Sequence, residues 1–194
     1  ASWFINENEA VEVSYPSGTK AIFEKSGDGS YKSPIGVYDT LTETGGGYVL
    51  TLKDLSKYSF NAQGKLTGIA DRYGNTITYS YSGDKVTEMS DPAGRTIAFE
   101  YNGDGLLVKA TGPNSVIYRY DYDSNHNLVK VTGPEGYTAQ YTYDESNRIN
   151  KVTDANGNQV VRNEYDLLGR IVRQYDGNNL ISYFIYSDAT KERF

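Results

Sequence analysis

Apolar and polar residues alternate along much of the chain. Ile77, Tyr79 and Tyr81 fall on one side of an extended segment, while Thr78 and Ser80 fall on the other. The same alternation, with aromatic residues on the apolar side, recurs in residues 97–101 and 118–122. A period of two predicts β-strands with one aromatic face packed against a core and the opposite face in contact with solvent.

The strands belong to a repeat, because an aromatic residue followed by a small or polar residue recurs at spacings of 21, 20, 21, 21, 22 and 21. These anchors are Phe60, Tyr81, Tyr101, Tyr122, Tyr143, Tyr165 and Tyr186. An aliphatic residue follows each of the first six after five or six positions, at Leu66, Val86, Leu107, Leu128, Ile149 and Ile171. The phase predicts about six tandem units.

A second set of aliphatic residues stands three positions further on and ends where Gln174 interrupts it. The set comprises Ile69, Met89, Ala110, Val131 and Val152. Simple alternation cannot place residues three apart on one face of a strand. We therefore expect either a β-bulge or partial burial of both faces in each outgoing strand.

Turn sequences separate the strands, as in Asp71–Asn75, Asp91–Arg95 and Asp154–Asn158. Asp caps its own backbone, Pro fixes φ, and Gly or Asn accepts a left-handed conformation. Each unit thus reads as strand, turn, strand, turn. Single hairpins are marginally stable, so stacked units must shield one another's aromatic faces.

The first part of the chain keeps strand character without the regular period. Strands are expected at Val11–Tyr15, Ala21–Glu24, Gly36–Leu41 and Tyr48–Leu52. We interpret residues 1–57 as degenerate hairpins that cap or continue the sheet, with a separate small β-domain as the weaker possibility. Residues 58–186 form the repeats and residues 187–194 a tail.

Composition argues against nucleic-acid binding and membrane insertion. Nineteen Tyr and 20 Gly favour strands and tight turns, and 19 basic against 25 acidic residues give a net charge of −6 without a basic stretch, so nucleic acid is not expected as a partner. The chain has no Cys, and no stretch resembles a signal peptide or the roughly 20 apolar residues of a membrane helix, so no membrane insertion is expected.

The segment Tyr165-Asp-Leu-Leu-Gly-Arg-Ile171 resembles the signature of YD (Rhs) repeats, and residues 58–79 resemble a full unit. The resemblance implies an all-β fold of tandem hairpins, a twisted and curved antiparallel strip that forms an arc of a hollow shell. In bacterial Rhs and toxin-complex proteins such a shell encloses a toxic domain, and related arrays occur at cell surfaces. Shells of this family contain a self-cleaving segment that resembles Asp-Pro-x-Gly-Leu. In this chain only Asp91–Arg95 is similar to it, and we interpret this segment as a turn of the repeat.

Catalytic and metal chemistry are not expected, and no cofactor is implied. His126 is the only histidine and lies in a turn. The run from Asp121 to Asn127 resembles a calcium loop but lacks Gly at the sixth and Glu at the twelfth position. Asp71, Asp91, Asp154 and Asp176 fall one per repeat, as turns require and a glycosidase site does not.

The anchors Phe60, Tyr81, Tyr101, Tyr122, Tyr143 and Tyr165 are expected in the core. Tyr73 and Tyr137 lie in turns and are candidates for contact with a ligand. We therefore predict a non-enzymatic scaffold, the wall of a shell around a toxin or other polypeptide, in a larger bacterial protein that is secreted or lies at the cell surface. Expected partners are further segments of the shell, the enclosed polypeptide, or copies of the chain paired at open strand edges.

The alternative is a cell-surface module that recognises carbohydrate or a partner protein through exposed aromatic residues and sheet edges.

Overall fold

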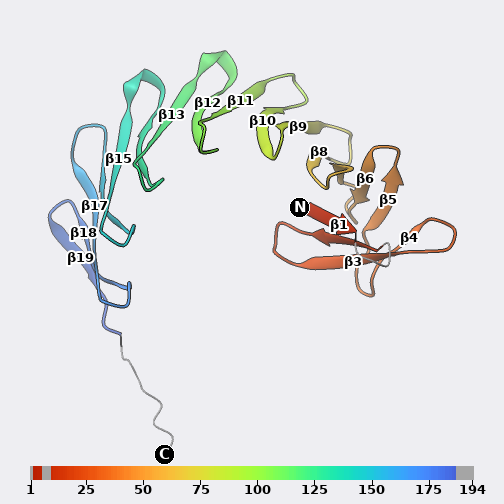
Figure 1. Ribbon diagram of the computed structural model, residues 1–194, viewed down its shortest axis with the longest axis horizontal. Helices are drawn as coiled ribbons and strands as arrows, with labels where there is room; N and C mark the ends of the chain where they lie inside the picture. The colour runs from red at the N-terminus through yellow and green to blue at the C-terminus, as the bar shows by residue number, and fades with distance from the viewer. Residues whose placement is uncertain (1, 6–9, 187–194) are drawn as a thin grey trace, which may run out of the picture. The chain divides into compact units, whose positions relative to one another are not determined.

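The computed structural model describes residues 2–5, as backbone, and residues 10–186; it divides the chain into two compact units, residues 1–98 and 99–194 (Figure 1). Two antiparallel sheets contain all the strands of the described residues. The first has four strands in the order β1 (Ser2–Ile5), β2 (Val11–Ser14), β3 (Lys20–Lys25) and β4 (Tyr31–Lys32). The chain is therefore all-β, as its alternation predicts.

The second sheet has 15 strands, and their order follows the chain from β5 to β19. In the first unit it contains β5 (Thr40–Thr44), β6 (Gly47–Thr51), β7 (Lys57–Asn61), β8 (Leu66–Ala70), β9 (Thr76–Ser82) and β10 (Lys85–Ser90). Strand β11 (Thr96–Tyr101) spans the boundary between the units. Each strand pairs with the next one in sequence, which is the tandem-hairpin arrangement that the 21-residue period predicts.

The second unit contains the remaining strands and two short 3₁₀ turns, η1 (Pro113–Ser115) and η2 (Pro134–Gly136). Its strands are β12 (Leu107–Thr111), β13 (Ile117–Tyr122), β14 (Leu128–Thr132), β15 (Thr138–Tyr143), β16 (Ile149–Thr153), β17 (Gln159–Tyr165), β18 (Ile171–Asp176) and β19 (Asn179–Tyr183). No helix in residues 2–5 and 10–186 is long and apolar enough to cross a membrane.

The first part of the chain differs from its prediction at one strand and one sheet. Residues 36–39 lie outside any strand, because Val37 N–H donates to the carbonyl of Pro34 in a turn and Gly36 has a φ of 84°. Strand β5 starts only at Thr40. Strands β1–β4 form a separate sheet, and the 15-stranded sheet of the repeats begins with β5. The N-terminal hairpins therefore continue the repeat sheet only from residue 40 onward. The boundary at residue 57 stays a prediction, and the tail at 187–194 lies outside the described residues.

A one-residue bulge in the outgoing strand explains the aliphatic residues that stand three apart. In β8, Leu66 pairs with Phe60 and Ile69 with Tyr58, so Thr67 is the extra residue between them. The same shift occurs in β10, β14, β16 and β18, where the extra residues are Thr87, Val129, Asn150 and Val172. The bulge brings both aliphatic residues of a unit onto the face of the anchor.

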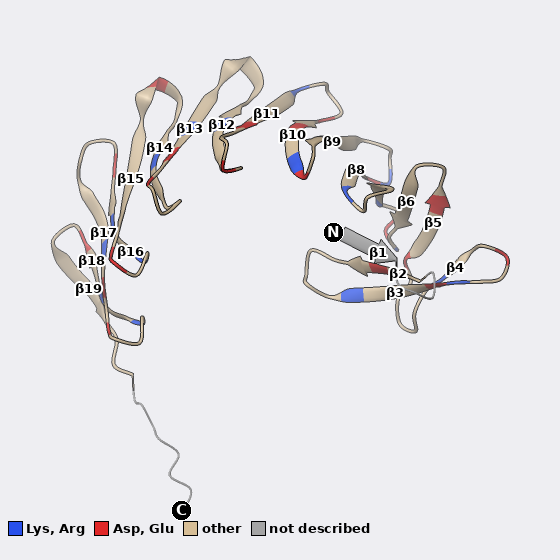
Figure 2. Ribbon diagram, in the orientation of Figure 1, with Lys and Arg blue, Asp and Glu red and all other residues tan. Residues whose placement is uncertain are grey.

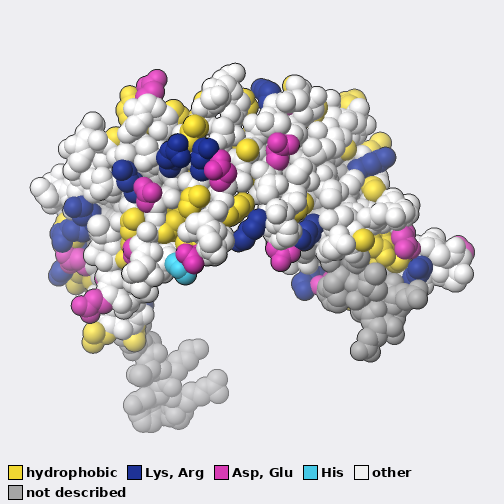
Figure 3. Space-filling model, turned by 45° about the horizontal axis from the view of Figure 1, so that its top comes forward, with side chains coloured by type: hydrophobic (Ala, Val, Ile, Leu, Met, Phe, Trp, Pro, Cys, Tyr) yellow, Lys and Arg dark blue, Asp and Glu magenta, His cyan; other side chains and the backbone are white. Residues whose placement is uncertain are grey.

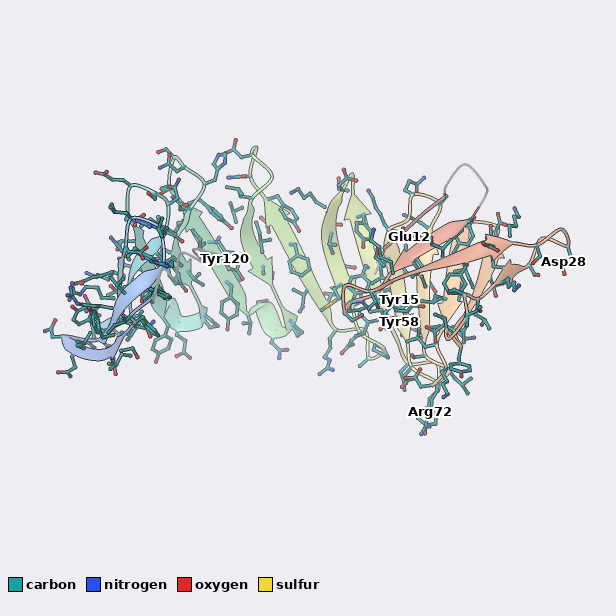
Figure 4. The ribbon with its side chains drawn as sticks, turned by 90° about the horizontal axis from the view of Figure 1, so that it is seen from below. Glu12, Tyr15, Asp28, Tyr58, Arg72 and Tyr120 are labelled. Carbon is teal, nitrogen blue, oxygen red and sulfur yellow. The ribbon has the colours of Figure 1, made fainter. Side chains whose placement is uncertain are left out.

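The buried core of the described residues lies in the first unit. Val11, Val13 and Phe23 have no exposed surface and form one cluster with side chains of β5–β7, including Leu50 and Phe60. Tyr15 and Tyr58, labelled in Figure 4, pack against this cluster. The first sheet and the start of the second thus bury each other's apolar faces, the usual way in which two sheets make a core.

Candidate functional site

The tyrosine anchors link each unit to the one before it. The hydroxyl of Tyr143 donates to the backbone carbonyl of Leu128 at 2.8 Å. Equivalent bonds join Tyr81 to Leu66, Tyr122 to Leu107, Tyr165 to Ile149 and Tyr186 to Ile171, at 2.6–2.9 Å. Burial of the rings is the first cause that raises the pKa of Tyr81, Tyr122 and Tyr143. The hydroxyl explains why the repeat uses Tyr where Phe would fill the same space.

Burial of the anchors differs along the chain. Phe60 is 4% exposed and belongs to the core, whereas Tyr81, Tyr101, Tyr122, Tyr143 and Tyr165 are only partly buried. In the register, Tyr143 lies opposite the aliphatic Ile149 of the outgoing strand, and Tyr81, Tyr122 and Tyr165 have the equivalent partners Val86, Leu128 and Ile171. The core role that the sequence suggests for all six therefore needs correction at the five tyrosines, four of which lie in the second unit, where none of the described residues is fully buried.

Gln174 interrupts the aliphatic series because its partner in the preceding strand is also polar. It pairs with Asn163, which stands where other units have Tyr or Phe, and its amide donates to Asn163 Oδ1 at 3.1 Å. A pair of hydrogen-bonded amides replaces an aromatic and aliphatic pair. Both partners change together, so neither side chain is left without a hydrogen bond.

Eight loops share one geometry, in which an Asp or Asn at the first position caps the loop. In the loop 144–148, Asp144 Oδ1 accepts the backbone N–H groups of Ser146 and Arg148 at 2.9 and 3.0 Å. The same two bonds occur at Asn61, Asp71, Asp91, Asn102, Asp123, Asp154 and Asp166. Each carboxylate or amide thus satisfies two backbone donors.

The fourth residue of each of these loops has a positive φ. Six of the eight are Gly, and the other two are His126 and Asn147, with φ of 64° and 58°. His126 therefore occupies a turn position that the backbone requires, and its ring lies 3.8 Å from Asp104 Oδ2. No group of three or more His, Asp or Glu that could hold a metal ion occurs within the described part of the chain.

Arg at the fifth loop position connects the loop to the next anchor. Arg148 Nε donates to Asp144 Oδ2 at 2.7 Å, and its guanidinium lies 4.5 Å from the ring centre of Tyr165. Arg170 repeats both contacts, with Asp166 at 2.8 Å and the ring of Tyr186 at 4.3 Å. The hydrogen bond from Arg148 is the first cause that holds the pKa of Asp144 below its usual range. The Tyr-Asp and Gly-Arg pairs of the motif are therefore parts of one contact network.

The two candidate ligand-contact residues are exposed in turns. Tyr73 is 74% and Tyr137 66% exposed. Arg72, which projects from the loop between β8 and β9 in Figure 4, lies with its guanidinium 4.7 Å from the ring centre of Tyr73. The geometry assigns no ligand to either residue, so their binding role stays a prediction.

A row of basic residues emerges on the strand face opposite the anchors of the second unit, which we call the basic face. Its members are Lys109, Arg119, Lys130, Lys151, Arg162 and Arg173, and cross-strand register places them on one face. Lys109, Lys130, Lys151 and Arg173 are 21, 21 and 22 residues apart. The ribbon of Figure 2 marks both basic and acidic residues along the strands of this part of the chain, and basic side chains gather over it in Figure 3.

Three carboxylates from the strands share the basic face, namely those of Glu100, Asp121 and Glu164. Glu164 accepts from two guanidinium groups, those of Arg162 and Arg173, each at 2.9 Å. Lys151 lies directly opposite Arg162 in the neighbouring strand. A shallow hollow of about 230 Å³ lies beside them, lined by Thr142, Asn150, Lys151, Arg162 and Asn163.

Comparison with known proteins shows that the chain is similar to a family of repeat proteins. A family model described as RHS Repeat matches residues 60–96, 82–117, 101–138 and 122–159, which together cover more than half of the 194 residues. The tRNA nuclease WapA of Bacillus subtilis (strain 168) and the tRNA3(Ser)-specific nuclease WapA of Bacillus spizizenii are each 41% identical over 61 residues. That match covers 31% of this chain and 3% of each relative.

Among solved structures, the crystal structure of TcdB2-TccC3-TEV matches 89% of this chain and 12% of that chain, with a TM-score of 0.51 and 12% sequence identity. At this identity the likeness shows the fold. The chain therefore spans a small part of both the curated relatives and the solved structure that it matches.

Proposed function

Because the chain belongs to the RHS repeat family, we propose that it is a non-enzymatic wall segment of a shell that encloses or presents a toxin or other polypeptide. The general role behind this proposal, a structural scaffold built of repeats, is supported by the family and the fold. The proposal further assigns the chain to a longer bacterial protein that acts outside the cell or at its surface.

The observation that carries the proposal is the use of the repeated polar residues in contacts between units. The tyrosine hydroxyls bond to the preceding unit, and within each unit the loop carboxylates hold the turn by capping its backbone N–H groups. Arg148 and Arg170 join each loop to the following ring. Residues with these roles maintain the array, which is what a wall requires of them.

The loop carboxylates are poorly suited to acid catalysis. A general acid needs a pKa raised toward the working pH. The pKa of Asp71, Asp91 and Asp154 is instead lowered, first by hydrogen bonds from Asn75, Arg95 and Asn158 respectively. The nuclease names of the WapA relatives describe proteins of which the match covers 3%. The proposal therefore assigns no catalytic role to this chain.

Protease protection tests the container role. The longer protein that contains this chain is treated with protease before and after unfolding. We expect a polypeptide outside the repeats to resist cleavage in the native protein and to be cut once the repeats unfold. Equal cleavage in both states would contradict the container role.

A second function, recognition of a glycan or partner surface, is favoured by the exposure of Tyr73 and Tyr137. A glycan array tests it, with Tyr73→Ala and Tyr137→Ala as variants and Tyr38→Ala, which removes another ring that is 73% exposed, as the matched control. Binding that only the first two substitutions abolish would support this function. A silent array would leave the scaffold as the better explanation.

A further inference from the structure

Like charges lie directly opposite each other on the basic face. Lys109 is the cross-strand partner of Arg119, and Lys151 is that of Arg162. Such pairs on one sheet face destabilise a sheet, whereas opposite charges would stabilise it. The arrangement recurs two units apart without helping the fold, and local rules of this kind are most often broken where a surface has a function.

The basic face also carries more positive charge than its own carboxylates can balance. Glu100 pairs with Lys109 at 2.6 Å, Asp121 lies opposite Lys130, and Glu164 serves two arginines. Six cations thus share three carboxylates, in a chain whose net charge is −6. An anionic partner would supply the missing counter-charge.

The spacing of the cations fits a linear partner. Lys109, Lys130 and Lys151 hold the same place in the outgoing strands β12, β14 and β16. Every second strand of a sheet lies about 10 Å further along, at roughly 4.8 Å per strand. A polypeptide in the extended polyproline II conformation advances about 3.1 Å per residue with three residues per turn, so every third side chain lies on one face and meets this step.

The other side chains of the basic face favour a polypeptide over a nucleic acid. Single-stranded nucleic acids need free aromatic rings on which bases stack. Tyr175 and Tyr183 are the tyrosines at this end of the face, and the guanidinium groups of Arg162 and Arg173 already lie 3.8 and 5.6 Å from their ring centres. Between the cations, Thr132 and Gln140 offer hydrogen bonds to a peptide backbone.

We infer that the basic face binds an extended acidic polypeptide, whose carboxylates lie along the row from Lys109 to Arg173 with one seated at the hollow beside Lys151 and Arg162. The inference rests on the proposed function, since it gives the chemistry of the polypeptide that the wall would contact.

Fluorescence anisotropy with labelled poly-L-glutamate as the probe tests the inference on the whole chain. We expect saturable binding at low ionic strength that weakens as salt is added. Lys151→Glu should weaken it about tenfold, and Lys32→Glu, which changes the charge equally at an exposed position of β4, should change it less than about twofold. Lys151→Glu should not lower Tm, because it removes a like-charge pair; Lys151→Gln is the second variant should the first fail to fold.

Three outcomes would overturn the inference: no saturable binding of poly-L-glutamate, equal weakening by both Lys→Glu variants, or binding of polyuridylic acid as tight as that of poly-L-glutamate. The last would assign the face to polyphosphates. If the protein does not bind poly-L-glutamate but still protects a polypeptide from protease, the container role stands and the binding of an acidic polypeptide is wrong. If it binds poly-L-glutamate without protecting any polypeptide, the basic face binds acidic chains but the container role is wrong.

Discussion

Residues 1–98 enclose side chains such as Phe23 that have no exposed surface, whereas residues 99–186 contain no fully buried residue among those described. In the first unit, two sheets exclude water from a shared cluster. In the second, each strand pair relies on its sequence neighbours through ring, carbonyl and guanidinium contacts. The comparison teaches that one repeat pattern supports two kinds of stability, apolar burial where a second layer exists and directional polar contacts where it does not.

The largest expected effect is loss of the core of the first unit. Phe23→Ala should lower the free energy of unfolding by about 3–5 kcal/mol, because it opens a cavity in a fully buried cluster. Val152→Ala, at a partly buried site of β16, should cost less than half as much. Urea denaturation followed by circular dichroism measures both. If both variants lose the same free energy of unfolding, the two units do not differ in how much they depend on a buried core.

The next effect is the loss of a loop cap in the second unit. Asp144→Ala leaves the N–H groups of Ser146 and Arg148 without their acceptor and frees Arg148 from its place over Tyr165. We expect its urea midpoint to fall by less than that of Phe23→Ala and by clearly more than that of Glu145→Ala, the exposed neighbour in the same loop. A midpoint equal to that of the Glu145 variant would show that the cap does not stabilise the array.

A smaller effect is expected from one hydroxyl. Tyr143→Phe removes the bond to the carbonyl of Leu128 and keeps the ring, which should cost about 1 kcal/mol. Tyr137→Phe removes a hydroxyl from a ring that is 66% exposed and serves as the control, with no expected change. Thermal denaturation distinguishes them. If both variants melt like the parent, the ring alone makes the contact between units.

The smallest expected effect is a change in how stability depends on acidic pH. The pKa of Asp144 in the folded chain is lowered, first by the hydrogen bond from Arg148 and then by backbone N–H groups. A lowered folded pKa gives stability that is complete above the unfolded value of about 3.9 and is lost as the pH falls through the folded value. Asp144→Asn, which keeps a capping amide as at Asn61 and Asn102, should therefore lose less stability than the parent between about pH 6 and about pH 3. An identical loss in both proteins would show that this carboxylate does not contribute.

The repeat could be read from the sequence because its signals are local. Aromatic alternation gives the strands, and the Asp and Gly positions give the loops, down to the turn at His126. The bulge was one of two alternatives, since one extra residue such as Thr67 is visible only in the strand pairing. The turn at Gly36 was missed because the segment from Gly36 to Leu41 has strand-like composition but contains a left-handed residue.

Burial and surface chemistry depend on information that is not local. Whether Tyr81 or Phe60 is fully covered depends on a second layer, which periodicity along one strand does not reveal. The aromatic period describes only the anchor face of the sheet, so it does not predict the basic face on the opposite side. Lys109, Lys130 and Lys151 follow the same period and were the available signal.

The contact from Tyr143 to the carbonyl of Leu128 runs one way only, from a later unit to an earlier one. A unit with a tyrosine anchor therefore donates a hydrogen bond to its predecessor and offers a carbonyl acceptor to its successor. Duplicating a whole unit in tandem regenerates every such joint without any new complementary surface. Gene duplication can thus lengthen an array of this kind in steps of about 21 residues, whereas an insertion of any other length would interrupt the series.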